Sequence, residues 1–581
     1  MGGRGRVALC AVIILLAFSA TVTYPFLNWD DQDVFLRNGA FAAPGFVRWA
    51  FTTTYMEHYQ PLAWLVWGAL AQLSTLTSTA AHALTVGLHA FAAALVFVLA
   101  RRLGLGEGTA FVGALLFGLH PLRVEVVAWA SAMPYALALV FALLSTLAFL
   151  DSRTHRRHRG LFALSLMLFA LSLLARPIAL GLPAAFLALD WWVGLRADMH
   201  AGTGADTLVR RYEGHDAVSL RAWRIVPFIF LAPAAAYVES RARLTATLVE
   251  VGVGARLTLA STAPLKYLAK TLVPIDLTPL DPLALAPQTD VTSMILGAAA
   301  LGAISWAAWR WRHRRPGSTV AWFSYLALLA PAAGLVPSGL QATADRYMYL
   351  PAVPVSLWIA SAGAEVVRRR RIGQPAAAVA AAALIGALAV LAHQQTRYWS
   401  NSIALWTRAV DVDPRSDIAL YNLASALSAA GRHTEALEQY DKVLQIVPDH
   451  RDARRNRDLI RAATLEDDAN RLAAAGRLDA AIDQYRAAIA LDSARVHSQA
   501  ALGMALVQRS RTADAIPHLR EAVRLGTPEP AVSNALAFSL FAAGRTRDAC
   551  EVLEAARVRF PADQDVARNL TQLGRECAAR K

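Results

Sequence analysis

Long apolar runs constrain this chain more than any other feature of its sequence. A transmembrane helix needs about 20 mostly apolar residues, and eleven runs of about this length lie before residue 395. The first run also fits a signal peptide, but its apolar stretch is longer than a usual signal core and Thr21-Val22-Thr23 is a poor cleavage site. We therefore expect an uncleaved first helix and an all-α polytopic membrane bundle. The predicted spans are residues 7–27, 79–100, 109–127, 132–150, 160–176, 177–195, 225–240, 291–309, 318–336, 347–367 and 375–394.

The charge distribution predicts which side of the membrane each loop occupies. The 581 residues carry 57 Lys and Arg against 43 Asp and Glu, a net charge of +14. Before Thr396 there are 31 basic and 19 acidic residues, and 21 of those 31 fall in segments that are cytoplasmic if the N-terminus is cytoplasmic. Cytoplasmic loops of membrane proteins are enriched in Lys and Arg, so we interpret the excess positive charge as a signal of membrane orientation. The expected partners of these basic loops are anionic membrane lipids, and we expect no nucleic-acid partner. The charge pattern predicts a membrane protein with a cytoplasmic N-terminus, whose residues after 395 are extracytoplasmic.

Two outer segments have helical spacing of leucines without the length of a span. They are residues 55–76 and residues 255–273, the second of which carries Lys266 and Lys270. Such stretches are typical of amphipathic helices that lie in the membrane interface. The alternative is that they are additional spans, which would change the sidedness of later loops.

The C-terminal part of the sequence repeats with a period of 34 residues. Small residues, leucines and a turn Gly or Ser recur in four copies, and Pro414 lies 34 residues before Pro448, so that a half repeat precedes them. The charged stretch 451–461 inserts 11 residues, which lengthen one helix or loop. The pattern resembles the tetratricopeptide repeat, an α-solenoid that binds proteins or peptides. We predict a membrane domain over 1–396 and a repeat domain over 397–581, divided into a half repeat 401–416, repeats 417–450, 462–495, 496–529 and 530–563, and a cap 564–581.

Polar residues gather in the segments predicted to lie at the outer surface. Ionisable groups in or beside membrane spans are costly and are candidate functional residues. The three cysteines are too few for a disulfide framework, and no Cys/His cluster has zinc spacing. The sequence also lacks the glycine-rich phosphate loops and the metalloprotease and serine-hydrolase motifs. The candidates are Asp30, Asp31, Asp33, Glu57, His58, His120, Arg123, Glu125, Arg176, Asp345 and Arg346.

Several motifs around these residues carry a family resemblance. The chain reads His-Pro-Leu-Arg-Val-Glu over 120–125 and Ala-Asp-Arg-Tyr-Met-Tyr-Leu-Pro over 344–351, and it ends in the repeats. In this order the motifs are similar to the transmembrane-and-tetratricopeptide-repeat O-mannosyltransferases of the GT-C superfamily. The resemblance, to bacterial multi-span members in particular, implies a GT-C-like bundle in a bacterial inner membrane with periplasmic repeats. It also implies an acidic pair at Asp30 and Asp31 and a polyprenyl-phosphate sugar donor. Two positions depart from the family pattern: Gln60 stands where eukaryotic members tend to have Arg, and Arg176 stands where many bacterial relatives have Lys.

The residues support an inverting sugar transfer. A carboxylate takes the proton of the acceptor hydroxyl, whereas a phosphate leaves as a stable anion without an acid. Guanidinium groups match phosphate oxygens and stabilise the charge that develops on them. We expect Asp30 or Asp31 to be the base and the other to orient it or bind a divalent metal, the need for which the sequence leaves open. The expected donor-phosphate contacts are Arg176, Arg346 and Arg123, with His58, His120, Glu125 and Asp345 in support.

Each assignment has a structural alternative. Asp30 and Asp31 also fit a solvated acidic flank of the first span, and His120 fits a buried histidine with satisfied hydrogen bonds. Asp345 and Arg346 also fit a membrane-interface anchor.

The leading functional expectation is a membrane glycosyltransferase that moves a sugar, with mannose as one candidate, to an extracytoplasmic acceptor such as a protein Ser or Thr hydroxyl. One alternative is a non-catalytic envelope scaffold that binds proteins through its repeats. The other is a lipid-linked polysaccharide ligase or flippase.

Overall fold

The computed structural model describes residues 2–73, 76–153, 158–200, 223–243, 251–282, 289–334 and 341–579. Within these ranges the chain is almost entirely helical, apart from one short pair of strands. Its contacts divide it into two compact units, Met1–Asn422 and Leu423–Lys581. Here the first is called the membrane unit and the second the repeat unit.

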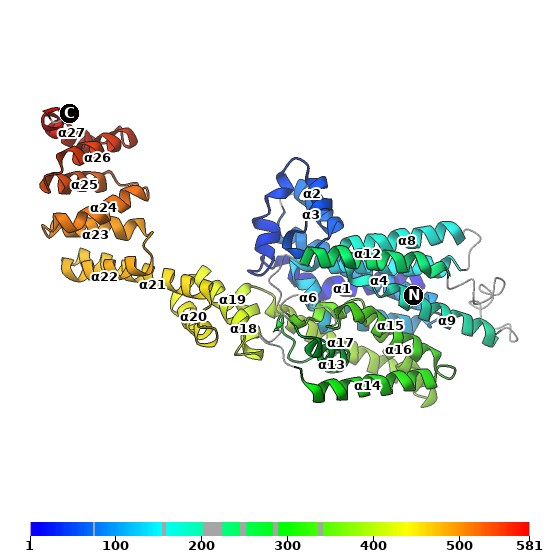
Figure 1. Ribbon diagram of the computed structural model, residues 1–581. Coiled ribbons are helices and arrows are strands. Elements are labelled where there is room, and N and C mark those ends of the chain that lie inside the picture. Colours follow the sequence, from blue (N-terminus) through cyan, green and yellow to red (C-terminus); the bar gives the residue numbers. More distant parts are fainter. Residues whose placement is uncertain are drawn as a thin grey trace. The chain divides into compact units, whose positions relative to one another are not determined.

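The membrane unit is a bundle of helices (Figure 1). Helix α4 packs against α1, α5 and α7, and α7 packs against α8. The two strands pair antiparallel, with Asp281 opposite Thr343. The helices are α1 (Gly3–Phe18), α2 (Phe46–Thr52), α3 (Pro61–Leu73), α4 (Ser78–Arg102), α5 (Glu107–Gly118), α6 (Val124–Ala128), α7 (Met133–Asp151), α8 (His158–Ala175), α9 (Leu182–His200), α12 (Val226–Arg243), α13 (Val253–Leu272), α14 (Val291–Arg310), α15 (Pro316–Leu329), α16 (Ala352–Arg369), α17 (Gln374–Tyr398), α18 (Ser402–Val412) and α19 (Asp417–Ala429), with strands β1 (Asp281–Pro282) and β2 (Gln341–Thr343).

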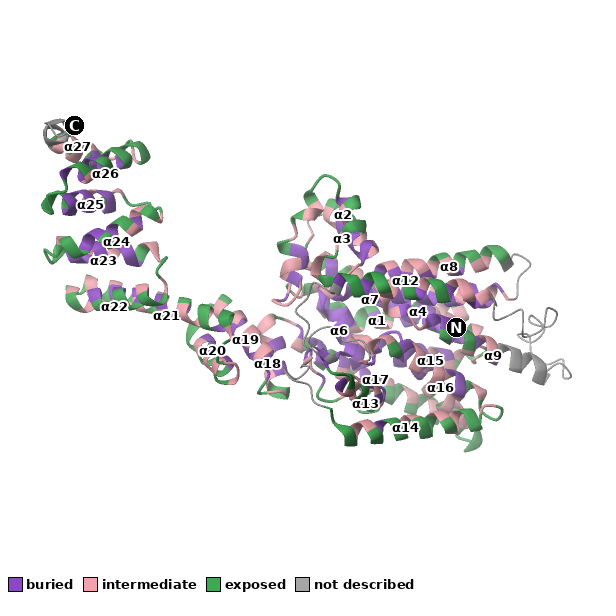
Figure 2. Cartoon of the chain, in the orientation of Figure 1, coloured by how far each residue is buried: buried purple, intermediate pink, exposed green. Residues whose placement is uncertain are grey.

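Burial separates core helices from outward-facing ones. Figure 2 shows buried residues along α4, α6 and α7 and exposed residues along much of α14. On α14 and α17 the exposed residues include Leu296, Trp306 and Val379, each about two-thirds exposed (65%, 68% and 70%). Large exposed apolar surfaces are typical of contacts with lipid or with other proteins. These helices are therefore compatible with insertion in a membrane.

Five described helical segments are long and apolar enough to cross a membrane, and a sixth is added if one bent pair counts as a span. The prediction of about eleven spans therefore stays a prediction. The bent pair, Glu107–Gly118 with Pro121–Ala128, breaks by 57°, because Pro121 cannot continue the hydrogen bonding of the preceding helix. Several other predicted spans are shorter helices: α15 has 14 residues, and the apolar part of α8 runs from Arg159 to Ala175. The five segments are Gly3–Thr23, Ser78–Arg102, Ala130–Asp151, Val291–Arg310 and Gln374–Tyr398.

The two segments predicted to be interfacial form helices, α3 and α13. Neither is among the five candidate spans. Their position relative to a membrane stays a prediction.

The repeat unit consists of antiparallel helix pairs, as the 34-residue period predicts. Its turns need a left-handed residue, and Gly431, Gly476 and Gly544 supply it with φ near +75°, a conformation that costs glycine little. Ser510 takes the same place in the third repeat with φ 58°. The helices are α20 (His433–Ile446), α21 (Arg451–Ala474), α22 (Leu478–Leu491), α23 (Val496–Gln508), α24 (Thr512–Arg524), α25 (Pro530–Ala542), α26 (Thr546–Arg559) and α27 (Gln564–Ala579).

The 11-residue insertion lengthens a helix rather than a loop. Helix α21 runs without a break through 24 residues, from the inserted stretch into the first helix of the next repeat. Arg457 and Arg461 of the insertion both pair with Asp441 of α20. Two of the charged residues of this stretch thus attach it to the preceding helix.

A buried ion pair inside the repeat unit yields a stability prediction. Glu466 is 8% exposed and accepts hydrogen bonds from Arg495 Nε at 2.9 Å, from Arg495 Nη2 at 3.0 Å and from the Ser498 hydroxyl. Burial alone would raise the pKa of Glu466, but the bonds from Arg495 and Ser498 outweigh it and hold the pKa below 4.5. We expect Glu466→Gln to lower the free energy of unfolding by about 2 kcal/mol at pH 7, measured by urea unfolding.

Because the folded-state pKa of Glu466 is depressed, its stabilising contribution is present above pH 4.5 and is lost as the pH falls. The difference between wild type and Glu466→Gln should therefore shrink toward pH 3. The control is Glu438→Gln, on the exposed side of α20, which should change stability little. An equal effect of both variants would contradict the prediction.

Candidate active site

The acidic pair follows the first helix, and its two members have different surroundings. Asp31 is fully buried. One of its carboxylate oxygens accepts a hydrogen bond from the Leu27 N–H at 2.9 Å, and the other accepts from the Ser131 N–H at 2.9 Å and from the Ser131 hydroxyl at 2.5 Å. Asp31 thus links the loop after the first helix to Ser131, in the segment that precedes α7.

Asp30 has a partly exposed side chain, and its carboxylate accepts no hydrogen bond in the part of the chain that the structure describes. Burial raises the pKa of Asp30 to about 6, although the charges of Arg346 and Arg176 lower it. A carboxylate with this pKa is largely ionised at neutral pH and can still accept a proton efficiently. Burial raises the pKa of Asp31 to about 6 as well, so the pKa does not separate the two aspartates. Asp30 is the one free to act on a ligand because the carboxylate of Asp31 is already bonded to Leu27 and Ser131.

Asp31 leads to a test of its structural role. Asp31→Ala removes the acceptor from the buried N–H of Leu27 and from the partly buried N–H of Ser131. Unsatisfied buried donors cost about 1–3 kcal/mol. We expect this variant to lower the free energy of unfolding by about that amount, measured by thermal or chemical denaturation in detergent. A variant as stable as wild type would contradict this role.

Arg176 lies directly after α8, where Pro177 disfavours a further helical residue and the backbone is extended. Its guanidinium donates to Gln60 Oε1 at 2.8 Å and to the Tyr135 hydroxyl at 3.3 Å, and it lies 2.9 Å from His58 Nε2. His58 Nδ1 in turn lies 2.9 Å from a carboxylate oxygen of Glu239. Arg176 is therefore held by neutral groups, and its positive charge has no carboxylate in direct contact among the described residues.

Arg346 lies in the short helical turn Asp345–Met348. Its backbone N–H donates to Glu125 Oε2 at 2.8 Å and its side chain forms an ion pair with the same carboxylate. The guanidinium also donates to Gln341 Oε1 at 2.8 Å and to the Tyr135 hydroxyl at 3.3 Å. Because Arg176 and Arg346 share Tyr135, the two guanidiniums lie beside one another.

The combined arrangement is chemically specific. The Asp30 carboxylate accepts no hydrogen bond from the residues that the structure describes. It is within electrostatic reach of two arginines that converge on one hydroxyl. Paired guanidiniums suit the oxygens of a phosphate. The carboxylate suits a hydroxyl that must lose its proton.

Two other predicted site residues lie elsewhere. Arg123 is fully buried, donates to the Met348 carbonyl at 2.7 Å and lies over the rings of Phe117 and Tyr349. His120 accepts from the Leu122 N–H at 3.2 Å through Nδ1, so its Nε2 donates to the Thr271 carbonyl at 2.9 Å. Both side chains bind backbone groups of neighbouring segments, and neither contacts Arg176 or Arg346 in the described structure.

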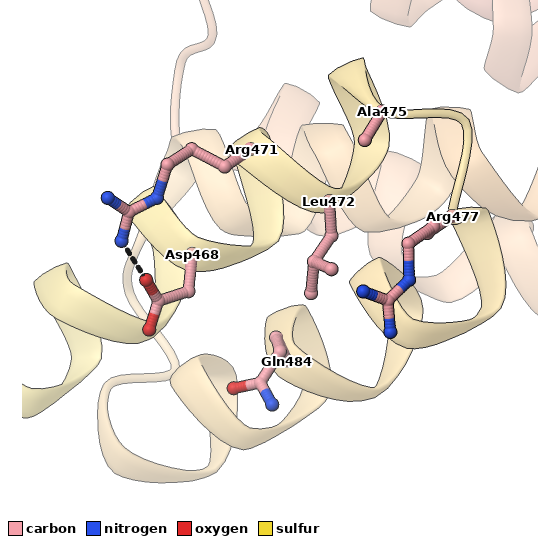
Figure 3. A pocket seen from close by; sticks show the side chains of 6 residues that line it. All are labelled: Asp468, Arg471, Leu472, Ala475, Arg477 and Gln484. Atoms are coloured by element: carbon pink, nitrogen blue, oxygen red, sulfur yellow. Dashed lines mark hydrogen bonds and ion pairs between the residues drawn. The ribbon is translucent and has the colours of Figure 1, made fainter.

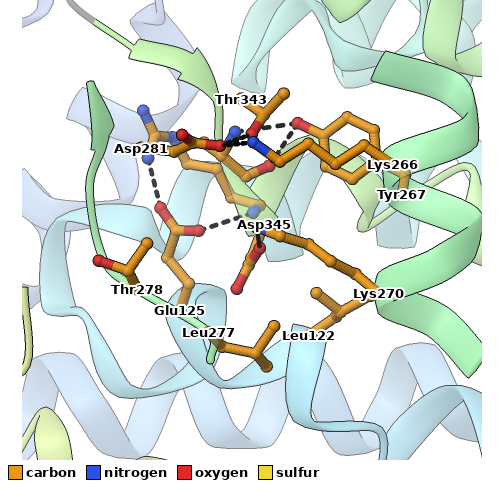
Figure 4. A network of polar contacts seen from close by, with 12 residues as sticks. Leu122, Glu125, Lys266, Tyr267, Lys270, Leu277, Thr278, Asp281, Thr343 and Asp345 are labelled. Atoms are coloured by element: carbon orange, nitrogen blue, oxygen red, sulfur yellow. Dashed lines mark hydrogen bonds and ion pairs between the residues drawn. The ribbon is translucent and has the colours of Figure 1, made fainter. Parts of the chain in front are cut away.

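Asp345 takes part in a neighbouring polar network, shown in Figure 4. Lys270 of α13 donates to Asp345 at 2.8 Å, and Lys266 pairs with Asp281 of β1. Between them, the Tyr267 hydroxyl donates to the Ala344 carbonyl at 2.9 Å. This network fixes the segment that carries Arg346 against α13.

Among the described residues no group of three or more His, Cys, Asp or Glu side chains is placed to hold a metal ion. A pocket of about 340 Å³ lies in the repeat unit, lined by Asp468, Arg471, Leu472, Ala475, Arg477 and Gln484 (Figure 3). It contains none of the predicted site residues. Its exposed Arg471 is already paired with Asp468.

Three residues of the arrangement were not predicted from sequence. Tyr135 lies in an apolar helix and Gln341 is uncharged, so neither has a clear signal in the sequence. Glu239 does have one, because it is a lone acid near the end of a predicted span. The places of Tyr135 and Gln341 in the site are determined by how helices distant in the sequence pack together.

Comparisons with known proteins identify the repeats. A profile of the tetratricopeptide repeat family matches residues 387–451 and 467–530. The chain carries tetratricopeptide repeats. No curated protein matches the chain.

Solved structures with some similarity are repeat proteins. The chain is similar to TTC0263, a tetratricopeptide-repeat protein of Thermus thermophilus, with 20% identity over 32% of this chain and 94% of that one and a TM-score of 0.16. It is also similar to YrrB, described as a tetratricopeptide-repeat protein with an unusual peptide-binding site, with 14% identity over 36% of this chain and 98% of that one and a TM-score of 0.18. MamA of Desulfovibrio magneticus RS-1 matches with 18% identity over 28% of this chain and 85% of that one and a TM-score of 0.18.

Proposed function

We propose that this protein binds other proteins through its tetratricopeptide repeats and that its membrane unit is an inverting GT-C glycosyltransferase. The enzyme would transfer a sugar, with mannose as one candidate, from a polyprenyl-phosphate donor to a Ser or Thr hydroxyl of a bound protein. Repeats of this class present surfaces for peptides and partner proteins. The observation that carries the catalytic part is the Asp30 carboxylate, which accepts no hydrogen bond from the described residues and is within electrostatic reach of Arg176 and Arg346.

The proposed transfer is a single displacement. Asp30 takes the proton of the acceptor hydroxyl as its oxygen attacks the anomeric carbon of the sugar. The bond between that carbon and the phosphate oxygen breaks, and polyprenyl phosphate leaves with the bonding electrons. Arg176 and Arg346 bind the phosphate oxygens and stabilise their growing negative charge. Asp31 holds the loop in which Asp30 lies.

An extracytoplasmic repeat unit fits this function and has one further support. Cys550 of α26 is disulfide-bonded, whereas Cys10 in α1 is a free thiol. The sequence has too few cysteines for a disulfide framework, but a single disulfide already indicates an oxidising compartment. Disulfides persist in oxidising compartments such as the periplasm and are rare in the cytosol. This agrees with a cytoplasmic N-terminus and with the basic cytoplasmic loops.

The repeats by themselves favour a second candidate, a non-catalytic scaffold anchored in the membrane. It rests on the family match to residues 387–451 and 467–530. Exposed aromatic side chains on α25, Phe538 and Phe541, are the kind of surface that a protein partner covers. In this case the polar cluster of the membrane unit is a structural network.

One experiment separates the two functions. Membranes containing the full-length chain are incubated with radiolabelled polyprenyl-phosphate mannose, and label is measured in the protein fraction. The transferase reading expects incorporation by wild type and none by Asp30→Asn. The scaffold reading expects no incorporation above membranes that lack the chain, together with a protein partner whose binding survives Asp30→Asn and is weakened by Phe538→Ala with Phe541→Ala.

A further inference from the structure

Asn28, two residues before Asp30, is fastened to the helices that begin the repeat sequence. Its backbone N–H donates to the Ser402 hydroxyl of α18 at 2.9 Å, and its side-chain amide donates to the Asn422 carbonyl of α19 at 3.1 Å. Its side-chain oxygen accepts from the Trp406 indole N–H at 2.7 Å. Asn28 therefore uses its backbone donor and both ends of its side chain to contact these two helices, all within the membrane unit.

The next residue, Trp29, continues this contact through its ring. It stacks on Trp129 with ring centroids 4.8 Å apart and lies against Trp406 at 5.1 Å. Trp129 also lies under the Arg346 guanidinium, 5.5 Å from its ring centroid. The aromatic cluster of Trp29, Trp129, Trp399 and Trp406 thus connects α18, the Asp30 loop and one of the arginines.

The Asp30 loop is consequently held on both flanks. Asp31 fastens one side to Ser131, and Asn28 fastens the other to α18 and α19. Asp30 lies between these attachments. Its carbonyl accepts from the Val34 N–H at 2.9 Å, but its carboxylate accepts no hydrogen bond from the described residues. A reactive group on a loop needs such support, since a misplacement of about 1 Å costs about 100-fold in rate.

We propose that Asn28 and Trp406 are positioning residues for Asp30, so that the first helices of the repeat sequence complete the transfer site. This proposal rests on the proposed transferase function. It goes further by assigning α18 and the start of α19 a direct role in the geometry of the base. Neither residue contacts the reacting groups, and both act through the loop that carries Asp30.

The aromatic cluster provides a matched pair of variants. Trp406 and Trp399 are both almost fully buried, but only the Trp406 indole N–H is bonded, whereas the Trp399 indole N–H has no partner among the described residues. Trp406→Phe and Trp399→Phe make the same change in volume. Only Trp406→Phe removes a hydrogen bond to Asn28.

The test measures sugar transfer by each full-length variant in membranes at varied concentrations of polyprenyl-phosphate mannose. We expect Trp406→Phe to lower kcat by about 10- to 100-fold with an unchanged KM for the donor, and Trp399→Phe to change kcat by less than about threefold. Ser402→Ala, which removes only the acceptor of the Asn28 N–H, should lower kcat in the same way by about tenfold and serves if Trp406→Phe does not fold.

The outcomes are separable. An active wild type with equal kcat for Trp406→Phe and Trp399→Phe, or a loss that appears in KM alone, would overturn the positioning role and leave the transferase intact. A wild type without transfer, while Asp30→Asn is also inactive, would overturn both.

Discussion

Replacing Asp30 with asparagine is expected to lower sugar transfer by about 10²- to 10⁴-fold, the usual contribution of a general base. The amide keeps the shape of the side chain but cannot take the proton of the acceptor hydroxyl. The measurement is the initial rate of label transfer by full-length protein in membranes. Asp33→Asn is the control, because Asp33 lies three residues further along and is paired with Arg37 on the outside of the loop. Equal rates for Asp30→Asn and wild type would refute the assignment of the base.

The same residue makes a prediction about pH. Burial raises the pKa of Asp30 to about 6, with Arg346 and Arg176 lowering it and Asp33 and Glu57 raising it. Transfer by wild type should therefore fall as the pH drops below about 6, because the base becomes protonated. A folded-state pKa above the ordinary value means that the ionised carboxylate destabilises the fold at higher pH. Asp30→Asn should thus melt at a higher temperature than wild type at pH 7.5, and the difference should vanish near pH 4.

Replacing Arg176 with methionine is expected to lower kcat/KM for the lipid donor by about 10²- to 10³-fold. The fold should survive, because the side chains that contact Arg176 are neutral. The charge of Arg176 lowers the pKa of Asp30, but no carboxylate of the described residues is in direct contact with its guanidinium. Arg176→Lys keeps the charge without the planar fork and should retain part of the activity. The measurement is the donor dependence of transfer, alongside thermal denaturation.

Arg346→Met is the informative comparison for that prediction. Arg346 pairs with Glu125, whose side chain is only 3% exposed. Removing one member of a buried ion pair leaves an uncompensated charge and costs about 3–5 kcal/mol. We therefore expect Arg346→Met to lose activity together with stability, whereas Arg176→Met loses activity alone. The reverse pattern would mean that the two arginines have been assigned the wrong roles.

The sequence predicted the local features of this chain well because their signals are local. The repeats follow from a 34-residue period, and the insertion of 451–461 before the second full repeat could be located as well. Span count was harder, because α5 and α6 form one apolar run in the sequence but bend at Pro121. Apolar length alone cannot distinguish a membrane span from a short core helix.

The candidate site depends on contacts between distant segments, which the sequence indicates only in part. Sidedness placed Asp30, Arg176 and Arg346 on one side of the bundle, and the structure brings these three together. It could not distinguish Asp30 from Asp31, because the difference lies in the hydrogen bonds from Leu27 and Ser131. The sharing of Tyr135 by two arginines depends on how α7 is rotated, and the sequence carries no signal for that rotation.

The unbroken helix α21 has a geometric consequence for the repeat unit. An α-helix turns 100° and advances 1.5 Å per residue, so 11 inserted residues complete three turns with about 20° to spare and advance the axis by about 16 Å. The repeats after the insertion therefore keep nearly the same azimuth as those before it but are translated along the helix. An extended chain laid along both surfaces would have to traverse that step, which takes about five residues at about 3.3 Å each. A bipartite ligand with a short spacer would match this geometry better than one continuous motif.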